Sequence, residues 1–108
     1  MSFKLVLTTC PDLPTAHTIA EGLLDQELAA CVNLLPNMVS LYKWQGKVEQ
    51  SAEVQLFIKT DEINYPKLES YVCQHHPYEV PEIIALDITQ GQGAYLNWLA
   101  ENLSTGEK

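Results

Sequence analysis

Residues 38–60 read MVSLYKWQGKVEQSAEVQLFIKT, and this stretch decides the fold that the sequence predicts. Near its end the apolar Val54, Leu56 and Ile58 alternate with mostly polar residues, a period of two that is typical of a β-strand. The dipeptide at 45–46, Gln-Gly, lies between two such extended runs and indicates a turn. The stretch therefore predicts a long β-hairpin.

Strand and helix patterns flank this hairpin on both sides. Before the turn we expect a strand over 3–10, a helix over about 12–28, and a short buried strand over 30–36 that continues as 38–44 after a break at Pro36 and Asn37. After the turn we expect the return strand up to 60 and a helix from about Asn64 to Pro77. A strand over 82–89, buried on both faces, and a final helix over about 93–103 complete the chain. This order predicts an α+β, ferredoxin-like split βαβ sandwich (βαββαβ plus a C-terminal helix). The expected antiparallel sheet has strand order 4-1-3-2, with two helices on one face.

The composition indicates a single globular domain, expected over residues 1–103 with a loose tail at 104–108. The chain has 108 residues, of which 46% are hydrophobic and 19% charged, and no apolar run is long enough to span a membrane. A formal net charge of −8 argues against nucleic acid and anionic membranes as partners and favours cations. Three widely spaced cysteines predict no disulfide framework. With no signal-like N-terminus, we expect a cytoplasmic protein.

The hairpin is too long for the domain that carries it. Each arm of about a dozen residues spans ~40 Å when extended. A helix of about sixteen residues covers only ~24 Å. Part of the hairpin is therefore expected to project with unpaired strand edges, which a second subunit would cover. Tyr95 and Trp98 form an extra apolar stripe on the last helix, which also indicates a homo-oligomer, with cyclic symmetry expected.

Metal-ligating and polar side chains are expected to gather at one end of the sheet, where the first strand ends and the fourth begins. The residues expected there are Thr8, Cys10, Trp44, His75, His76, Pro77, Glu79 and Glu82. Thr8 and Cys10 should share one face of their strand, because side chains two residues apart lie on the same side. Paired imidazoles suit copper, zinc or nickel, and a nearby thiolate favours Cu(I) or zinc.

Each candidate also has a purely structural interpretation. Adjacent histidines on a helix point about 100° apart and chelate one ion poorly unless the helix unwinds. His75 would then extend the apolar stripe of its helix, and His76 would be a cation near the helix C-terminus. Cys10 precedes a helix N-terminus, where the dipole lowers a thiol pKa, or it simply fills the strand end. Cys31 and Cys73 are interpreted as packing residues.

An enzymatic function is not expected. The catalytic groups would be Glu79 or Glu82 with a histidine, or Cys10 with His75. The sequence offers no oxyanion hole, Gly-rich phosphate loop or cofactor fingerprint. Trp44, beside the turn at a predicted subunit junction, either walls a small-ligand pocket or packs in the interface.

Four stretches of the chain resemble the CutA divalent-cation tolerance family. They are ELAACVNLLP, SLYKWQGKVEQSAEVQLFIKT, HHPYEVPEIIAL and YLNWL. The resemblance runs from the first strand to the last helix. It implies a ferredoxin-like subunit in a tight homotrimer, similar in architecture to the PII signalling proteins, with the long hairpins pairing between subunits.

The resemblance also implies a metal site. The family is associated with tolerance to copper and other divalent cations, and its bacterial members bind copper through a histidine pair and a cysteine near the end of strand one. The pair corresponds to His75 and His76; Thr8 stands at the cysteine position, and Cys10 is the nearest thiol. The expected function is thus a trimeric, cytoplasmic copper- or divalent-cation-binding protein with His75, His76 and Cys10 as ligands.

A second function stays open at this point. It is a PII-like signalling or scaffold trimer that binds a small ligand in the cleft between subunits. The residues expected around that ligand are Trp44, Tyr78 and Glu82.

Overall fold

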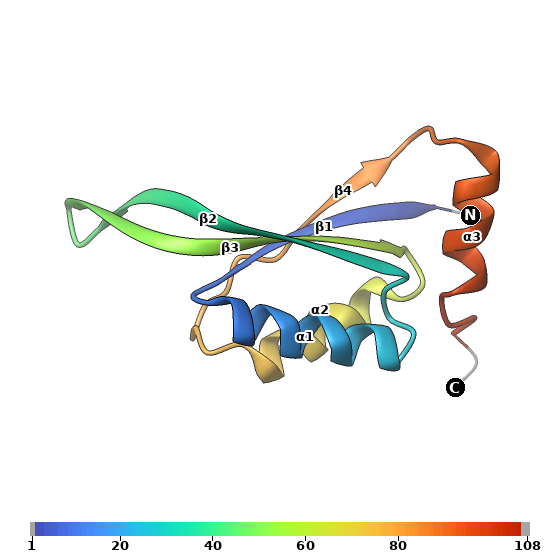
Figure 1. Ribbon diagram of the computed structural model, residues 1–108, viewed down its shortest axis with the longest axis horizontal. Helices are drawn as coiled ribbons and strands as arrows, with labels where there is room; N and C mark the ends of the chain where they lie inside the picture. The colour runs from blue at the N-terminus through green and yellow to red at the C-terminus, as the bar shows by residue number, and fades with distance from the viewer. Residues whose placement is uncertain (1, 107–108) are drawn as a thin grey trace.

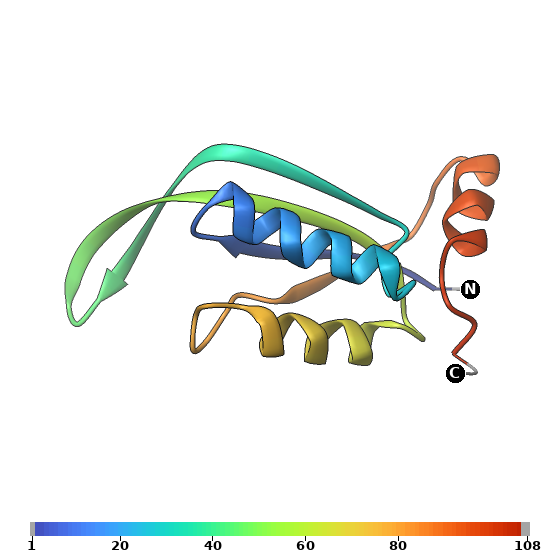
Figure 2. The same cartoon turned by 60° about the horizontal axis from the view of Figure 1, so that its bottom comes forward.

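The structure is a computed structural model that describes residues 2–106. Its elements are, in chain order, β1 (Phe3–Cys10), α1 (Leu13–Asp25), β2 (Cys31–Trp44), β3 (Lys47–Asp61), α2 (Tyr65–His75), β4 (Ile84–Ile88) and α3 (Gly93–Glu101). The strands form one antiparallel sheet in the order β2-β3-β1-β4. Helices α1 and α2 lie side by side on one face of this sheet (Figures 1 and 2). The predicted ferredoxin-like order is therefore confirmed.

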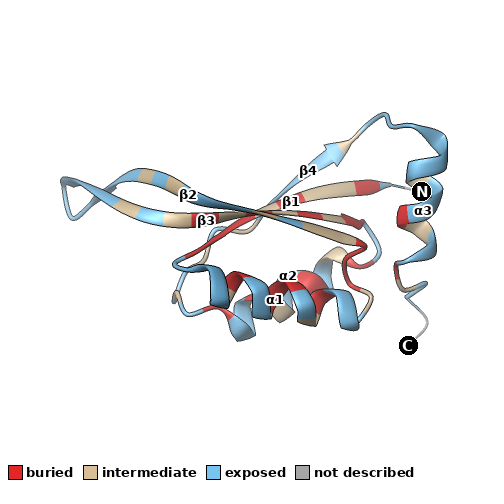
Figure 3. Cartoon of the chain, viewed as in Figure 1, coloured by how far each residue is buried: buried red, intermediate tan, exposed pale blue. Residues whose placement is uncertain are grey.

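The hydrophobic core lies between the sheet and these two helices (Figure 3). Val54, Leu56 and Ile58 point into it, as their alternation predicted, and Leu23 and Val72 face them from the helices. A smaller cluster joins α3 to the start of β1 and is formed by Phe3, Ala30, Leu99 and Leu103. Burying these apolar side chains is the main driving force that holds the helices to the sheet.

Local signals fix the ends of α1. Asp12 caps its N-terminus, because the Asp12 carboxylate accepts a 2.8 Å hydrogen bond from the Thr15 backbone N–H. The same hydrogen bonds from Thr15 lower the pKa of Asp12 below its usual range. The helix ends at Asp25, three residues earlier than predicted, and Glu27 then takes a positive φ of 58°.

The hairpin is formed by β2 and β3, which pair from Cys31 opposite Lys59 to Trp44 opposite Lys47. The predicted turn is confirmed: Gln45 and Gly46 both have positive φ, 50° and 80°, the conformation of a tight two-residue hairpin turn. The predicted break at 36–37 is a β-bulge rather than the end of a strand.

The tip of the hairpin extends beyond the other strands, as predicted. β1 pairs with β3 only over residues 54–61, so residues 38–53 form a two-stranded ribbon, hereafter the overhang (Figure 1). Its apolar side chains are largely exposed: Leu41 is 67% exposed and Val48 is 68% exposed. The overhang therefore lacks cover from its own chain.

Two predictions about the last strand need correction, its bounds and its burial. β4 spans Ile84–Ile88 rather than 82–89, and it is not covered on both faces, because Ile84 is 51% exposed. β4 is an edge strand that pairs only with β1 and runs beyond the helices that cover the rest of the sheet (Figure 1). Tyr95 and Trp98 on α3 are also exposed, in agreement with the predicted extra stripe.

The segment after α3 is attached to the domain at Ser104. Its backbone N–H donates to the Glu27 carbonyl at 2.9 Å, and its carbonyl accepts from the Asn64 amide at 2.9 Å. Residues 107–108 of the predicted tail lie outside the described residues. No helix within 2–106 combines the length and apolar character needed to cross a membrane.

Thr8 and Thr60 are a matched pair of fully buried threonines that test the hydrogen bonding of the core. The Thr60 hydroxyl donates to the Leu28 carbonyl at 2.7 Å, whereas the Thr8 hydroxyl has no partner within residues 2–106. A buried unpaired hydroxyl is destabilising, so Thr8→Val should raise the free energy of unfolding by about 1 kcal/mol. Thr60→Val should lower it by about 1–2 kcal/mol. Urea unfolding of both variants measures this, and a loss of stability in Thr8→Val would contradict it.

Candidate functional site

The two histidines lie where α2 ends. His75 is the last residue of the helix, whereas His76 is extended, with φ −84° and ψ 137°. Pro77 accounts for this change, because the residue before a proline is sterically pushed out of the helical region. The two side chains consequently enter different surroundings.

His76 is buried, with 8% of its surface exposed, and both ring nitrogens are bonded. The Tyr78 backbone N–H donates to Nδ1 at 3.1 Å, so Nε2 carries the proton and donates to the Thr9 carbonyl at 2.6 Å. This ring ties the end of α2 to the end of β1. The interpretation of His76 as a helix-terminal cation is therefore replaced by a buried, hydrogen-bonded link.

His75 is the exposed member of the pair. Its Nδ1 donates to the Tyr71 carbonyl at 2.8 Å, and its ring stacks on the Tyr71 ring with centroids 4.0 Å apart. Its Nε2 is left as an acceptor at the surface. The prediction that His75 extends the core stripe is wrong, because Leu68 and Val72 are buried and His75 is not.

Cys10 is fully buried in the core at the end of β1. Burial, together with the smaller effect of the nearby negative charges of Asp12 and Glu53, raises the pKa of its thiol to about 11. The expectation that the helix dipole lowers this pKa is wrong, since desolvation dominates. Cys31 is half-buried, whereas Cys73 is exposed and is not the packing residue that was predicted.

The donors at this end of the sheet form a pair rather than a cluster. Cys10 Sγ lies 3.8 Å from His76 Nε2. A thiolate and an imidazole on one tetrahedral ion, with bonds of about 2.3 and 2.0 Å, are ~3.6 Å apart, so this pair fits one ion. Within residues 2–106, no three His, Cys, Asp or Glu side chains gather as metal ligands. His75 is not joined to the pair, and Thr8 shares the buried face with Cys10 but supplies no sulfur.

A second feature is a cavity of about 960 Å³ where β1 ends, between the overhang and the loop that joins α2 to β4. Trp44, Tyr78 and Glu82, the three residues expected around a small ligand, all line it. The overhang contributes Tyr42, whose hydroxyl lies 2.8 Å from the Ser51 hydroxyl. Trp44 lies on the overhang side of this cavity, and Tyr78 and Glu82 lie on the side of the loop.

The polar lining of the cavity is acidic. Four glutamates line it, namely Glu49, Glu53, Glu79 and Glu82. The Tyr78 hydroxyl donates to Glu53 at 2.9 Å. Burial, and after it the hydrogen bond to Glu53, raises the pKa of Tyr78 to about 12. The Tyr78 hydroxyl therefore keeps its proton and stays a donor at neutral pH.

Sequence reasoning missed Glu49, Glu53 and Thr9 as parts of this cavity. A signal for the two glutamates was present, because Glu49 and Glu53 are four residues apart on a strand and therefore share a face. Thr9 offered no such signal. Its place in the cavity follows from the end of β1 lying beside the overhang.

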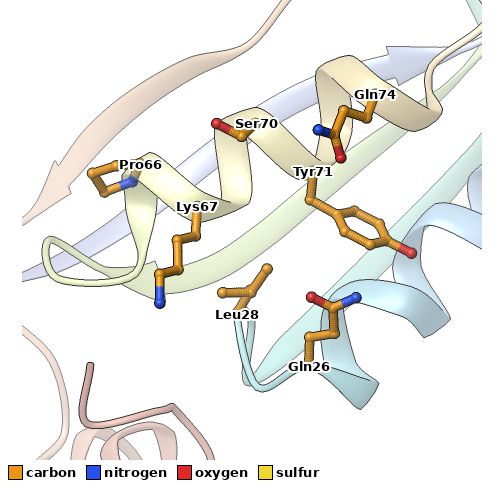
Figure 4. Close-up of a pocket in the computed structure, with 7 residues that line it drawn as sticks. All are labelled: Gln26, Leu28, Pro66, Lys67, Ser70, Tyr71 and Gln74. Carbon is orange, nitrogen blue, oxygen red and sulfur yellow. The ribbon is translucent and has the colours of Figure 1, made fainter. Parts of the chain in front are cut away.

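Two smaller hollows lie on the helices. One, of about 370 Å³, is lined by Pro14, Thr15, Thr18, Ile19, His75 and Pro77. The other, of about 350 Å³, is lined by Gln26, Leu28, Pro66, Lys67, Ser70, Tyr71 and Gln74 (Figure 4). Figure 4 shows the Lys67 and Tyr71 side chains extending from α2 toward the segment after α1. Neither hollow contains a pair of the predicted site residues.

Comparison with known proteins settles the family. Residues 4–102 match the family model described as CutA1 divalent ion tolerance protein. The chain belongs to this CutA1 family. It is 48% identical over 99 residues to the divalent-cation tolerance protein CutA of Thermus thermophilus, which covers 92% of this chain and 96% of that one.

Solved CutA structures agree with the fold of this CutA1 chain. The Thermus thermophilus protein superposes with a TM-score of 0.92 at 46% identity, covering 94% of this chain and 99% of its own. CutA1 from Oryza sativa gives 0.95 at 38% identity, covering 97% and 96%. A CutA from Archaeoglobus fulgidus, described as periplasmic, gives 0.91 at 33% identity, covering 94% and 99%.

The Tyr78–Glu53 contact predicts a pH dependence. Because the folded pKa of Tyr78 is raised, its contribution to stability is present below the usual pKa near 10 and is lost as pH rises through about 12. Tyr65, whose pKa is also raised to about 12, mainly by burial and then by Glu69, is the matched case. In an ultraviolet phenolate titration, Glu53→Gln should lower the pKa of Tyr78 part of the way toward 10, and Glu69→Gln should affect Tyr65 only. Titration of Tyr78 near 10 in the unaltered chain would contradict this.

Proposed function

We propose that this CutA1 chain is a non-enzymatic, homotrimeric metal-binding protein of the cytoplasm that contributes to tolerance of copper and other divalent cations. Its relatives are named for divalent-cation tolerance. The observation that carries the proposal is the separation of 3.8 Å between Cys10 Sγ and His76 Nε2, which suits two ligands of one ion.

The chemistry of this pair favours a soft ion. A thiolate with an imidazole selects Cu(I) or zinc over hard cations. Binding requires Cys10 to lose its proton, which its raised pKa of about 11 opposes. Binding also requires His76 to release the Thr9 carbonyl. Metal affinity at this pair should therefore rise with pH.

His75 plays a separate role in the proposal. Its free Nε2 at the surface offers an imidazole to divalent copper, but the ring does not share the surroundings of His76. The two histidines thus bind two different ions: His76 is the buried ligand of one, and His75 is the exposed ligand of the other.

Exposed strand edges and apolar surface support a trimer. The overhang carries large exposed apolar side chains, β4 is an uncovered edge strand, and Tyr95 and Trp98 are exposed on α3. Soluble proteins normally cover such edges, and a cyclic arrangement of copies covers each copy in the same way. The match of the whole domain to CutA structures places this chain among proteins of the same shape.

The proposal also states that the protein is not an enzyme. This part rests on the burial and hydrogen bonding of Cys10 and His76, two of the candidate catalytic residues. The Cys10 thiol is buried with a raised pKa, which makes it a poor nucleophile. Both nitrogens of His76 are already bonded to backbone groups. Neither residue is free to act as a general base.

Copper titration of variants tests the metal proposal. Anaerobic competition with a coloured Cu(I) chelator should show that Cys10→Ala lowers Cu(I) affinity at least about tenfold, because one of two ligands is lost. The His75→Ala variant is the matched control and should change it by less than about twofold. Thermal melting checks that both variants fold. Equal Cu(I) affinity in Cys10→Ala and the unaltered chain would contradict the proposal.

A second candidate function is a PII-like signalling or scaffold trimer that binds a small ligand. The observation that favours it is the cavity of about 960 Å³, in which Trp44, Tyr78 and Glu82 meet. A hollow of this size with aromatic walls and convergent polar groups is typical of ligand sites.

A further inference from the structure

We propose that the cavity at the end of β1 binds a small linear organic cation with two or more ammonium groups, of the diamine or polyamine class. This inference rests on the second candidate function, the ligand-binding trimer, and names the ligand class for its site. Three observations carry it: the charge of the lining, the spread of the carboxylates, and the aromatic and apolar walls.

The charge of the lining selects a cation. Four of the chain's fourteen acidic residues line the cavity, and no lysine, arginine or histidine lies among its lining residues. Among these four glutamates, and within residues 2–106, only Glu53 accepts a hydrogen bond from a neutral donor, the Tyr78 hydroxyl. A cavity lined by charges of one sign concentrates ligands of the opposite sign.

The spread of the carboxylates selects an organic cation over a metal ion. A metal needs several ligands within about 2.0–2.6 Å of one point. No three acidic side chains within residues 2–106 gather in that way, and the cavity is far larger than an ion. A ligand with ammonium groups separated by methylenes can reach two carboxylates that do not converge.

The uncharged walls suit the rest of such a ligand. Trp44 and Tyr42 present aromatic rings, which attract ammonium groups through their negative faces. Leu41 and Val80 are exposed apolar side chains that also line the cavity, and they can cover the methylene chain. The lining therefore combines charged and aromatic groups, which suit the ammonium groups of a polyamine, with apolar groups that suit its methylenes.

Thr9 adds a hydroxyl to this lining. The residue lines the cavity and is only 7% exposed. Its hydroxyl can accept a hydrogen bond from an ammonium N–H of a ligand.

Isothermal titration of the full chain, in its oligomeric state in solution, with 1,4-diaminobutane and with spermidine tests the inference. Both amines should bind saturably, spermidine more tightly, while uncharged 1,4-butanediol and Mg²⁺ alone should give no saturable heat. Glu82→Gln should weaken amine binding at least about fivefold because it removes one charge partner. Thr9→Val, which keeps the side-chain shape, should weaken it about threefold.

Asp25→Asn is the matched control, because it removes one negative charge from an exposed residue at the end of α1, outside the cavity. It should change amine affinity by less than about twofold. The inference is overturned by any of three results: no saturable amine binding up to about 10 mM, equal weakening by Asp25→Asn and Glu82→Gln, or Mg²⁺ binding that Glu82→Gln abolishes.

Two further measurements on the same samples distinguish failure of the polyamine site from failure of the proposed trimer and of the proposed copper site. Light scattering gives the oligomeric state, and Cu(I) competition gives metal affinity. A trimer that binds copper but no amine refutes the polyamine site alone, and it is the result expected if a second copy fills the cavity. A chain that stays monomeric refutes the trimer, whatever it binds.

Discussion

The structure depends on a mismatch in strand length. β3 has 15 residues, whereas β1, the strand that pairs with it inside the sheet, has 8. The seven residues of β3 beyond β1 extend the sheet by ~24 Å as a ribbon of two strands. Such a ribbon is marginal by itself in water, because it has no third strand or helix on which to bury its apolar side chains. The overhang therefore has two consequences. It exposes apolar side chains to water, and it forms one side of the cavity beside the end of β1.

The end of β1 is the point where core and cavity meet. Successive side chains on a strand point to opposite faces, so Cys10 enters the core while Thr9 lines the cavity. His76 bonds to the Thr9 carbonyl and lies beside the Cys10 sulfur, which fixes the end of α2 at the same place. The proposed copper pair and the proposed ligand cavity are thus adjacent, on opposite sides of one short piece of backbone.

Sequence patterns predicted the architecture well, because the features involved are local. The alternation of Val54, Leu56 and Ile58 and the Gln45–Gly46 turn each depend on a few neighbouring residues, and each appears as predicted. Topology rules then gave the strand order. The projection of the hairpin followed from lengths alone.

The details of the site depend on tertiary burial, and there the sequence was a weaker guide. Helical periodicity assigned His75 to the core, but Pro77 turns the chain so that His76 is buried instead. The position of Cys10 before a helix suggested a lowered pKa, but complete burial outweighs the dipole. The apolar run of β4 indicated cover on both faces, and sequence alone does not say whether that cover comes from the same chain or from another.

Hydrogen–deuterium exchange at high and low protein concentration tests the central claim, that other copies of the chain cover the overhang in the proposed trimer. At high concentration, we expect a particle of about three times the 12.1 kDa chain mass, with slow exchange at the amides of residues 38–53. On dilution to single chains, exchange in the overhang should quicken while residues 54–61 stay protected by β1. A particle of one chain mass at all concentrations, or an overhang that exchanges equally fast in both states, would contradict the account.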